Sequence, residues 1–492
     1  MKTGIEEIEA IETTSEIPAA YPGVAPKISH AVFLTGSQVA RRLLRLVFVL
    51  LAARVIGPKQ FGTYALLLAM VELVAVASGS GLVDYLTRET AKDERLGWGL
   101  GSQLAWLRLA YLLPISAAAL GILRLLGYPQ LVLAGASGMC LTLVPRAVSE
   151  TVQGLLRGIG RYGLYLAIEL SLGLMLLAAG FLLLVRGGGL RHVIAAELAA
   201  SGLAALAALF IAVRHRTADR TRLPWIEAVR KSLPFNIYPL VGSLYNRLDV
   251  VMLSKLAGNY ATGIYTVAYR SMEMFQLIPY GVLYSLLPSL SSPACRQAER
   301  RQRLERAMGL LACAALVTVL GAQVFAGPAV RVMLGVRYLE AVPAARILIW
   351  ALIPMYMNFG LNIGLLATGR EKVFVVTAST CLGVNFLANL IFIPIFSWRA
   401  AAAATIATEL VLLAQNVYWI RGALGVVPLP YGVLRRSIAF LGIFAVSMAG
   451  ERTAFPLLAG TSCFLAFLGY LYRSGIMAEI TLVWPTSPNV SA

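Results

Sequence analysis

Fourteen segments of about 20 mostly apolar residues follow one another along this chain. About 20 helical residues, at about 1.5 Å each, are enough to cross the hydrocarbon core of a bilayer. The predicted spans cover residues 33–56, 62–85, 100–123, 130–156, 162–186, 190–213, 234–256, 262–289, 305–327, 341–367, 373–396, 399–420, 433–450 and 454–472. The composition agrees, since 59% of the residues are hydrophobic and only 13% are charged. Because helices satisfy their own backbone hydrogen bonds in lipid, the chain is predicted to be an all-α integral membrane protein.

Basic residues in the loops set the expected orientation. The loops on the side of the N-terminus hold more than twice as many Lys and Arg as the opposite loops. Cytoplasmic loops carry the excess of Lys and Arg in membrane proteins. We therefore expect both termini in the cytoplasm. The net charge of +18 is assigned to these loops, and no nucleic-acid partner is expected, because no basic face of a soluble helix is present.

The pattern of one short loop occurs twice in the sequence. Residues 54–66 read RVIGPKQFGTYAL and residues 255–267 read KLAGNYATGIYTV, which places Gly-x4-Gly-x-Tyr at an offset of 201. Glu72 and Glu273 have the same offset, and GLLRGIGRYG at 154–163 is echoed by GLLATGREKV at 364–373. We interpret these echoes as a duplication of a six-helix unit, with a pseudo-two-fold axis along the membrane normal and a central cavity. The glycines are expected to permit tight outer turns, and the tyrosines to anchor at the membrane interface.

The spans and loops divide the chain into six parts. The expected parts are a disordered acidic tail (1–28), a first lobe (29–213), a basic cytoplasmic linker (214–233), a second lobe (234–421), two further helices (422–473) and a cytoplasmic tail (474–492). The polar, acidic first residues lack the apolar segment of a signal peptide.

Several stretches together resemble the polysaccharide transporter family, within the superfamily of multidrug and lipid-linked oligosaccharide exporters. They are GSQVARRLLRLVFVLLAARVIGPKQFGTYAL, QGLLRGIGRYGLYLAIEL, LPFNIYPLVGSLYNRLDVVMLSKLAGNYATGIYTVAYR and VMLGVRYLEAVPAARILI, and the resemblance covers roughly residues 30–430. It implies two six-helix lobes around a cavity and a flippase for O-antigen or capsule units. Such a protein lies in the inner (cytoplasmic) membrane and moves undecaprenyl-diphosphate-linked oligosaccharides outward across it by alternating access. The implied partners are this substrate, membrane lipids and glycan polymerase machinery.

Arginines inside the predicted spans are the candidate substrate-binding residues. A charge at mid-bilayer costs about 2.5–3.5 kcal/mol on insertion scales, so such a residue usually faces a cavity or a partner. Arg45 lies about 18 Å along the first helix from Phe33, and Arg247 has a comparable depth in the seventh. A guanidinium offers a planar fork to phosphate oxygens, which suits a diphosphate. Arg41, Arg42 and Arg270 are further candidates, with snorkelling to the interface as the alternative for Arg41 and Arg42.

Other charged residues carry weaker predictions. Asp249, Glu273 and Glu72 are candidates for ion coupling, although Glu273 lies three residues from Arg270 and the two equally well neutralise each other. Arg54 and Lys255 lie at the outer ends of their helices and are expected to be interfacial anchors.

Enzyme motifs are absent from the sequence. It has no Walker A, HExxH or GxSxG pattern, and its five cysteines and three histidines are scattered, so no catalytic residue, cofactor or metal site is predicted. Two alternatives to the flippase are a cation-coupled multidrug exporter of the same superfamily and a membrane-bound glycan polymerase or ligase. The exporter is expected to have an acidic, aromatic cavity, whereas the deep residues here are mostly basic.

Overall fold

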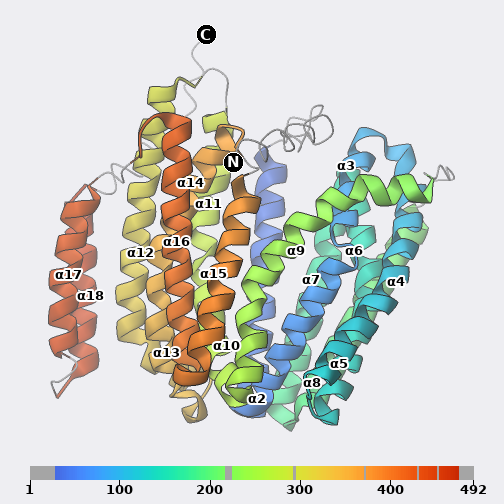
Figure 1. Ribbon diagram of the computed structural model, residues 1–492, viewed down its shortest axis with the longest axis horizontal. Helices are drawn as coiled ribbons and strands as arrows, with labels where there is room; N and C mark the ends of the chain where they lie inside the picture. The colour runs from blue at the N-terminus through green and yellow to red at the C-terminus, as the bar shows by residue number, and fades with distance from the viewer. Residues whose placement is uncertain are drawn as a thin grey trace.

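The computed structural model describes residues 28–215, 224–291, 295–370, 373–428, 432–450 and 454–475. Apart from turns, the described chain is helical (Figure 1). Ten of the described helices are long and apolar enough to cross a membrane, which confirms the predicted all-α membrane fold. The number of crossings, fourteen, stays a prediction. Most of the two predicted tails lies outside the described residues.

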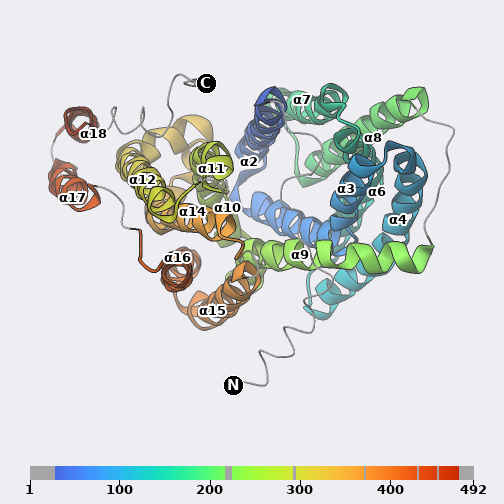
Figure 2. The ribbon, with the colours of Figure 1, turned by 90° about the horizontal axis from the view of Figure 1, so that it is seen from above.

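Seven helices form the first lobe. They are α2 (Ile28–Ala77), α3 (Gly81–Lys92), α4 (Glu94–Leu125), α5 (Gln130–Leu141), α6 (Leu143–Gly158), α7 (Tyr162–Arg186) and α8 (Leu190–His215). The second lobe contains α9 (Trp225–Leu256), α10 (Gly258–Phe275), α11 (Leu277–Ser291), α12 (Gln297–Met333), α13 (Ala341–Leu348), α14 (Leu352–Ala367), α15 (Val373–Phe396) and α16 (Trp398–Leu424), with the short 3-10 turns η1 (Val336–Tyr338) and η2 (Ile349–Ala351). The last pair, α17 (Val433–Gly450) and α18 (Pro456–Arg473), packs beside α12, outside the second lobe (Figure 2).

Several helix boundaries differ from the prediction, among them those of α2 and α9. α2 joins the first two predicted spans and bends at Gly57, which has a φ of 77°. Glycine adopts this angle without strain, and Pro58, the next residue, lacks the backbone N–H that would continue the helix. α2 then ends at Ala77 rather than near residue 85, because Gly79 takes a φ of 105°. α9 begins at Trp225 rather than near residue 234, directly after Pro224, so the second half of the predicted linker is helix.

The same pairs of helices meet in both lobes. In the first lobe α2 packs on α7, α7 on α8, α6 on α8, and α4 and α3 on α6. The corresponding pairs of the second lobe, α9–α15, α15–α16, α14–α16, α12–α14 and α11–α14, are also in contact. Figure 2 shows the two groups side by side, with α9 running across to α3 of the first lobe. This correspondence supports the predicted duplication.

The repeated loops contact each other at one end of the interface between the lobes. A Cβ atom added to Gly62 would lie 1.7 Å from the carbonyl oxygen of Asn259, and one added to Gly263 would lie 2.0 Å from that of Pro58. Pro58 and Asn259 are themselves 201 residues apart, so the two contacts are reciprocal. The offset therefore marks two backbone segments that approach each other too closely for any side chain. We call this end of the interface the floor.

Cations cross between the lobes next to the floor. The Nη1 atom of Arg54 donates to the carbonyl oxygen of Val332 at 2.6 Å, at the C-terminus of α12. Lys255, 201 residues later, donates to the carbonyl oxygen of Leu126 after α4. Each cation thus meets the negative end of a helix dipole in the opposite lobe. Both cations bind the opposite lobe, a contact that the sequence did not predict, and their expected role as interfacial anchors stays a prediction.

The two loop tyrosines are also placed differently from the prediction. Tyr64 and Tyr265 are fully buried and do not reach a membrane interface. The hydroxyl of Tyr64 donates to Glu197, and that of Tyr265 donates to Asp249. A buried tyrosine hydroxyl needs a hydrogen-bond acceptor, and each lobe supplies a carboxylate for its own tyrosine.

Candidate functional site: a charged cavity between the lobes

A cavity of about 720 Å³ lies between the two lobes. Helices α2, α3, α6, α7 and α8 line it from the first lobe, and α9, α10 and α11 from the second. Its lining includes Arg41 near the start of α2, Asp84 in α3 and Arg157 near the end of α6. Asp84 and Arg41 are exposed, with side chains 59% and 47% accessible, whereas the tyrosines of the floor are fully buried. The cavity therefore opens at the end opposite the floor, which we call the mouth.

Most of the predicted site residues line this cavity. Those that do are Arg41, Arg42, Arg45, Arg247, Arg270, Glu72 and Glu273. Asp249 is not among them: it is buried in the second lobe and also accepts a hydrogen bond of 2.8 Å from the backbone N–H of Val250. The structure therefore brings the five candidate arginines to one cavity and places one candidate acid elsewhere.

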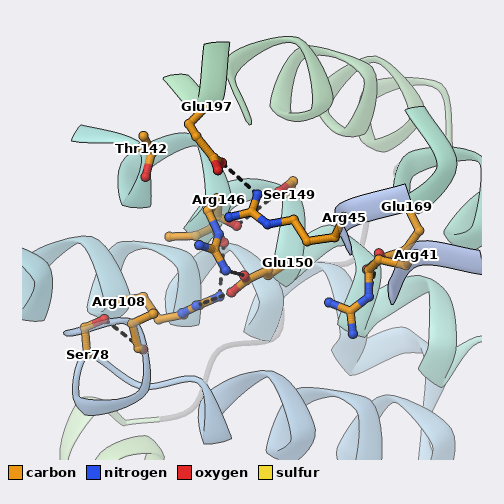
Figure 3. A network of polar contacts seen from close by, with 12 residues as sticks. Arg41, Arg45, Ser78, Arg108, Thr142, Arg146, Ser149, Glu150, Glu169 and Glu197 are labelled. Atoms are coloured by element: carbon orange, nitrogen blue, oxygen red, sulfur yellow. Dashed lines mark hydrogen bonds and ion pairs between the residues drawn. The ribbon is translucent and has the colours of Figure 1, made fainter. Parts of the chain in front are cut away.

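Arg45 and Arg41 on α2 are each paired with a carboxylate of another helix (Figure 3). Arg45 Nη1 lies 2.8 Å from Glu197 Oε2, and the other oxygen of Glu197 accepts from Tyr64. Arg41 Nε lies 3.1 Å from Glu169 Oε2. These carboxylates come from α8 and α7, so the pairs tie α2 to its own lobe. They also lower the cost of placing charge inside the membrane.

A second group surrounds Glu150 on α6. Arg108 Nη2 lies 2.6 Å and Arg146 Nη2 lies 3.5 Å from oxygens of Glu150. Arg157 approaches Asp84 at 3.5 Å closer to the mouth. The sequence offered several acids near spans and gave no reason to choose Glu169 or Glu197, because their partner arginines lie on another helix. Glu150 lies four residues from Arg146 on α6, but its closer partner, Arg108, comes from α4.

Four residues form an ion cluster that bridges the lobes: Glu72, Arg247, Arg270 and Glu273. The Nε atom of Arg247 donates to Glu72, and its Nη1 atom lies 3.5 Å from Glu273. Arg270 Nη1 donates to Glu273 at 2.8 Å, and its Nη2 atom lies 3.9 Å from Glu72. The predicted pairing of Arg270 with Glu273 is confirmed. We call these four residues the bridging cluster.

Arg42 is different from the other cavity arginines. Its guanidinium lies over the ring of Tyr280, 5.2 Å from the ring centre, and in the described part of the chain no carboxylate pairs with it. The cavity lining contains seven arginines and six acidic residues. The lining therefore carries one more positive than negative charge, and Arg42 is the arginine to which we assign this excess.

Two buried acids of the second lobe, Asp249 and Glu409, are held by neutral hydrogen-bond donors. Asp249 is hydrogen-bonded to Tyr265, and Glu409 accepts from Tyr245 at 2.9 Å and from Asn358 Nδ2 at 2.9 Å. Neither acid forms an ion pair in the part of the chain that the structure describes. Within that same part, no group of three or more His, Cys, Asp or Glu residues has the arrangement of a metal site.

The family model "Polysaccharide biosynthesis protein" matches residues 29–292, which is more than half of the chain. This chain belongs to the polysaccharide biosynthesis protein family. Because ten helices among its described residues are long and apolar enough to cross a membrane, it is a multi-pass membrane protein.

Two curated relatives come from Haloferax volcanii. One, "Probable low-salt glycan biosynthesis flippase Agl15", is 21% identical over 449 residues, covering 88% of this chain and 90% of that protein. The other, "Probable flippase AglR", is 23% identical over 401 residues, covering 75% of this chain and 78% of that protein.

Solved transporter structures share the fold. The lipid II flippase MurJ in an inward closed conformation has a TM-score of 0.70 at 14% identity, covering 92% of this chain and all of that one. A multidrug resistance MATE family transporter of the MOP superfamily, in an inward-facing conformation, has a TM-score of 0.67 at 14% identity and covers 80% of this chain. At such identities the likeness describes the architecture only.

Proposed function

We propose that this protein is a flippase of glycan biosynthesis. The substrate is an oligosaccharide linked through a diphosphate to undecaprenol, and the protein moves it from the cytoplasmic to the outer leaflet by alternating access. The observation that carries the proposal is the cavity between the lobes, into which both lobes direct arginines. Support also comes from relatives named as flippases and transporters rather than enzymes.

The cavity arginines suit an anionic head group. A guanidinium stays charged and donates two parallel hydrogen bonds to phosphate oxygens. We propose Arg45 from the first lobe and Arg247 from the second as diphosphate contacts, with Arg41, Arg42 and Arg270 nearby. Since both main contacts are already paired with carboxylates, the substrate has to compete with those carboxylates.

The mouth is proposed to face the cytoplasm, as the loop charges predict, in the inner membrane with both termini inside. The floor then closes the outer side. This arrangement is ready to accept a lipid-linked unit on the side where such units are assembled, and delivery outward supplies the glycan polymerase machinery.

The test is a translocation assay with purified protein in liposomes that contain a fluorescent undecaprenyl-diphosphate oligosaccharide. We expect Arg45→Ala and Arg247→Ala to abolish translocation and Arg45→Lys and Arg247→Lys to restore it partly, at equal protein levels, because Lys keeps the charge but loses the fork. Full activity of the double Ala variant would contradict the proposed contacts. In a strain without paralogues, unchanged surface glycan after deletion of the gene would contradict the function itself.

The MATE neighbours support one alternative, a cation-coupled multidrug exporter. That function needs a cavity that attracts organic cations, whereas this one has more arginines than acids. Deletion of the gene distinguishes the two functions. Loss of an exporter would lower the resistance of the cell to a panel of cationic dyes, whereas loss of a glycan flippase would leave that resistance unchanged.

A further inference from the structure

Each arginine of the bridging cluster faces both of its carboxylates. Arg247 contacts Glu72 and Glu273, and so does Arg270, with the longest of these N–O separations at 3.9 Å. Two cations and two anions therefore neutralise each other at the cavity wall. The arginine side chains are 13% and 17% accessible, so their donors face mainly the two carboxylates.

Only Glu72 belongs to the first lobe. It lies on α2, whereas Arg247 is on α9 and Arg270 and Glu273 are on α10. The contacts of Glu72 consequently cross the interface between the lobes, and those of Glu273 stay within the second lobe. The two acids occupy equivalent positions of the repeat, since their numbers differ by 201. They have the same chemistry and the same partners, yet only one of them can hold the lobes together.

We propose that Glu72 is an internal counter-ion that couples anion binding to movement of the lobes. In the empty cavity its carboxylate occupies the arginine donors that an anionic head group needs. A phosphate or diphosphate group binds the same planar forks and carries more charge and more oxygens, so it displaces Glu72. Displacement breaks a bond that stabilises the mouth-open state and so favours closing of the mouth. This inference rests on the proposed function, because it takes the anion to be the head group of the transported lipid.

Glu72 has room to leave the arginines. Its side chain is 34% accessible and lines the cavity, so a rotation can place the carboxylate in water. A carboxylate that returns to water recovers its hydration, which lowers the cost of displacement. Glu273 is 27% accessible and can also be displaced, but its release leaves the bond between the lobes intact.

The experiment compares Glu72→Gln with the matched control Glu273→Gln in the full-length protein, with inorganic pyrophosphate as the probe. Either substitution removes one negative charge from the same two arginines, so both variants should bind pyrophosphate several-fold more tightly than the native chain, as measured by calorimetry. Glu72→Asp keeps the charge on a shorter side chain, so its affinity for pyrophosphate should lie between those of the native chain and Glu72→Gln. It provides a second variant if Glu72→Gln folds poorly.

Lobe movement is measured between spin labels at Ala91 on α3 and Ala298 on α12, two exposed positions at the mouth end of different lobes. The five native cysteines are replaced first, and this background must bind pyrophosphate as the native chain does. We expect pyrophosphate to shorten the distance between the labels. Glu72→Gln should show the shorter distance without pyrophosphate, and Glu273→Gln should match the parent.

Three outcomes would overturn the inference: Glu72→Gln with the parent distance, Glu273→Gln with the shortened one, or unchanged pyrophosphate affinity in Glu72→Gln. These results leave the proposed function standing as long as the native cavity binds pyrophosphate. If pyrophosphate binds none of the proteins, the anion site and with it the proposed diphosphate substrate are rejected.

Discussion

At the scale of residues, the arginines of the cavity differ in whether a carboxylate is paired with them. Arg45 shares Glu197 with Tyr64, so its side chain is part of a buried network that supports the first lobe. Arg42 has a ring beneath it and no such carboxylate among the described residues. An arginine with free donors can bind a ligand without breaking a bond inside the protein. A paired arginine has to give up part of its bond to the carboxylate when a ligand binds.

Arg42→Ala is expected to weaken pyrophosphate binding without lowering thermal stability, because no ion pair is broken. Arg45→Ala, its matched control, leaves the buried Glu197 without a cation and should destabilise the protein by about 1–3 kcal/mol. Calorimetry and thermal melting in detergent measure the two effects. Equal losses of stability in both variants would contradict the distinction.

At the scale of elements, the floor explains why the loop is repeated. The part of α2 that follows its bend and the start of α10 approach until a glycine of each meets the backbone of the other. Close approach of this kind requires small residues, as in other membrane helix contacts. The cations Arg54 and Lys255 then cross to the helix ends of the opposite lobes, so the floor is held by matching contacts from both sides.

Gly62→Ala and Gly263→Ala should each lower the amount of folded protein in the membrane, since a methyl group there would meet a backbone carbonyl at 1.7 Å and 2.0 Å. Gly202→Ala is the control, because a Cβ at that helical position meets nothing within 4 Å. Fluorescence-detected size exclusion measures folded protein. Normal amounts of Gly62→Ala with loss of translocation alone would show that the floor acts in transport rather than in folding.

At the scale of the whole molecule, the described residues leave the cavity between the lobes open at the mouth and close it at the floor, so it is accessible from one side in this state. The floor and the cations beside it join the lobes at the end opposite the mouth, and the bridging cluster joins them at the cavity wall. Alternating access requires those contacts to break while the mouth closes. The direction of transport then depends on which side of the membrane the mouth faces.

Cysteine labelling in cells tests that direction. Ala91→Cys lies near the mouth and Arg191→Cys lies at the floor end of α8, and both positions are exposed. In a background without native cysteines, a membrane-impermeant maleimide should label Arg191→Cys in intact cells and Ala91→Cys only after the cells are opened. The reverse pattern would invert the proposed topology and the direction of transport.

The sequence alone determined the all-helical membrane architecture, the repeated loops and the arginines of the cavity. These features depend on short stretches of sequence. The length of an apolar segment defines a span, and a charged residue within that span has to face a cavity or a partner. The sequence also identified the pair Arg270 and Glu273, because residues three apart share a face of one helix.

Only the tertiary structure decided which charges meet across helices. Arg45 and Glu197 are 152 residues apart, and Glu72 and Arg247 are 175 apart. Their encounter depends on the rotation and packing of helices, which periodicity does not specify when a helix is apolar on all sides. The same holds for Tyr64 and Tyr265, which are fully buried and bind carboxylates 133 and 16 residues away on other helices. A single helix defines its faces, but only packing against other helices decides which face meets a partner, the cavity or lipid.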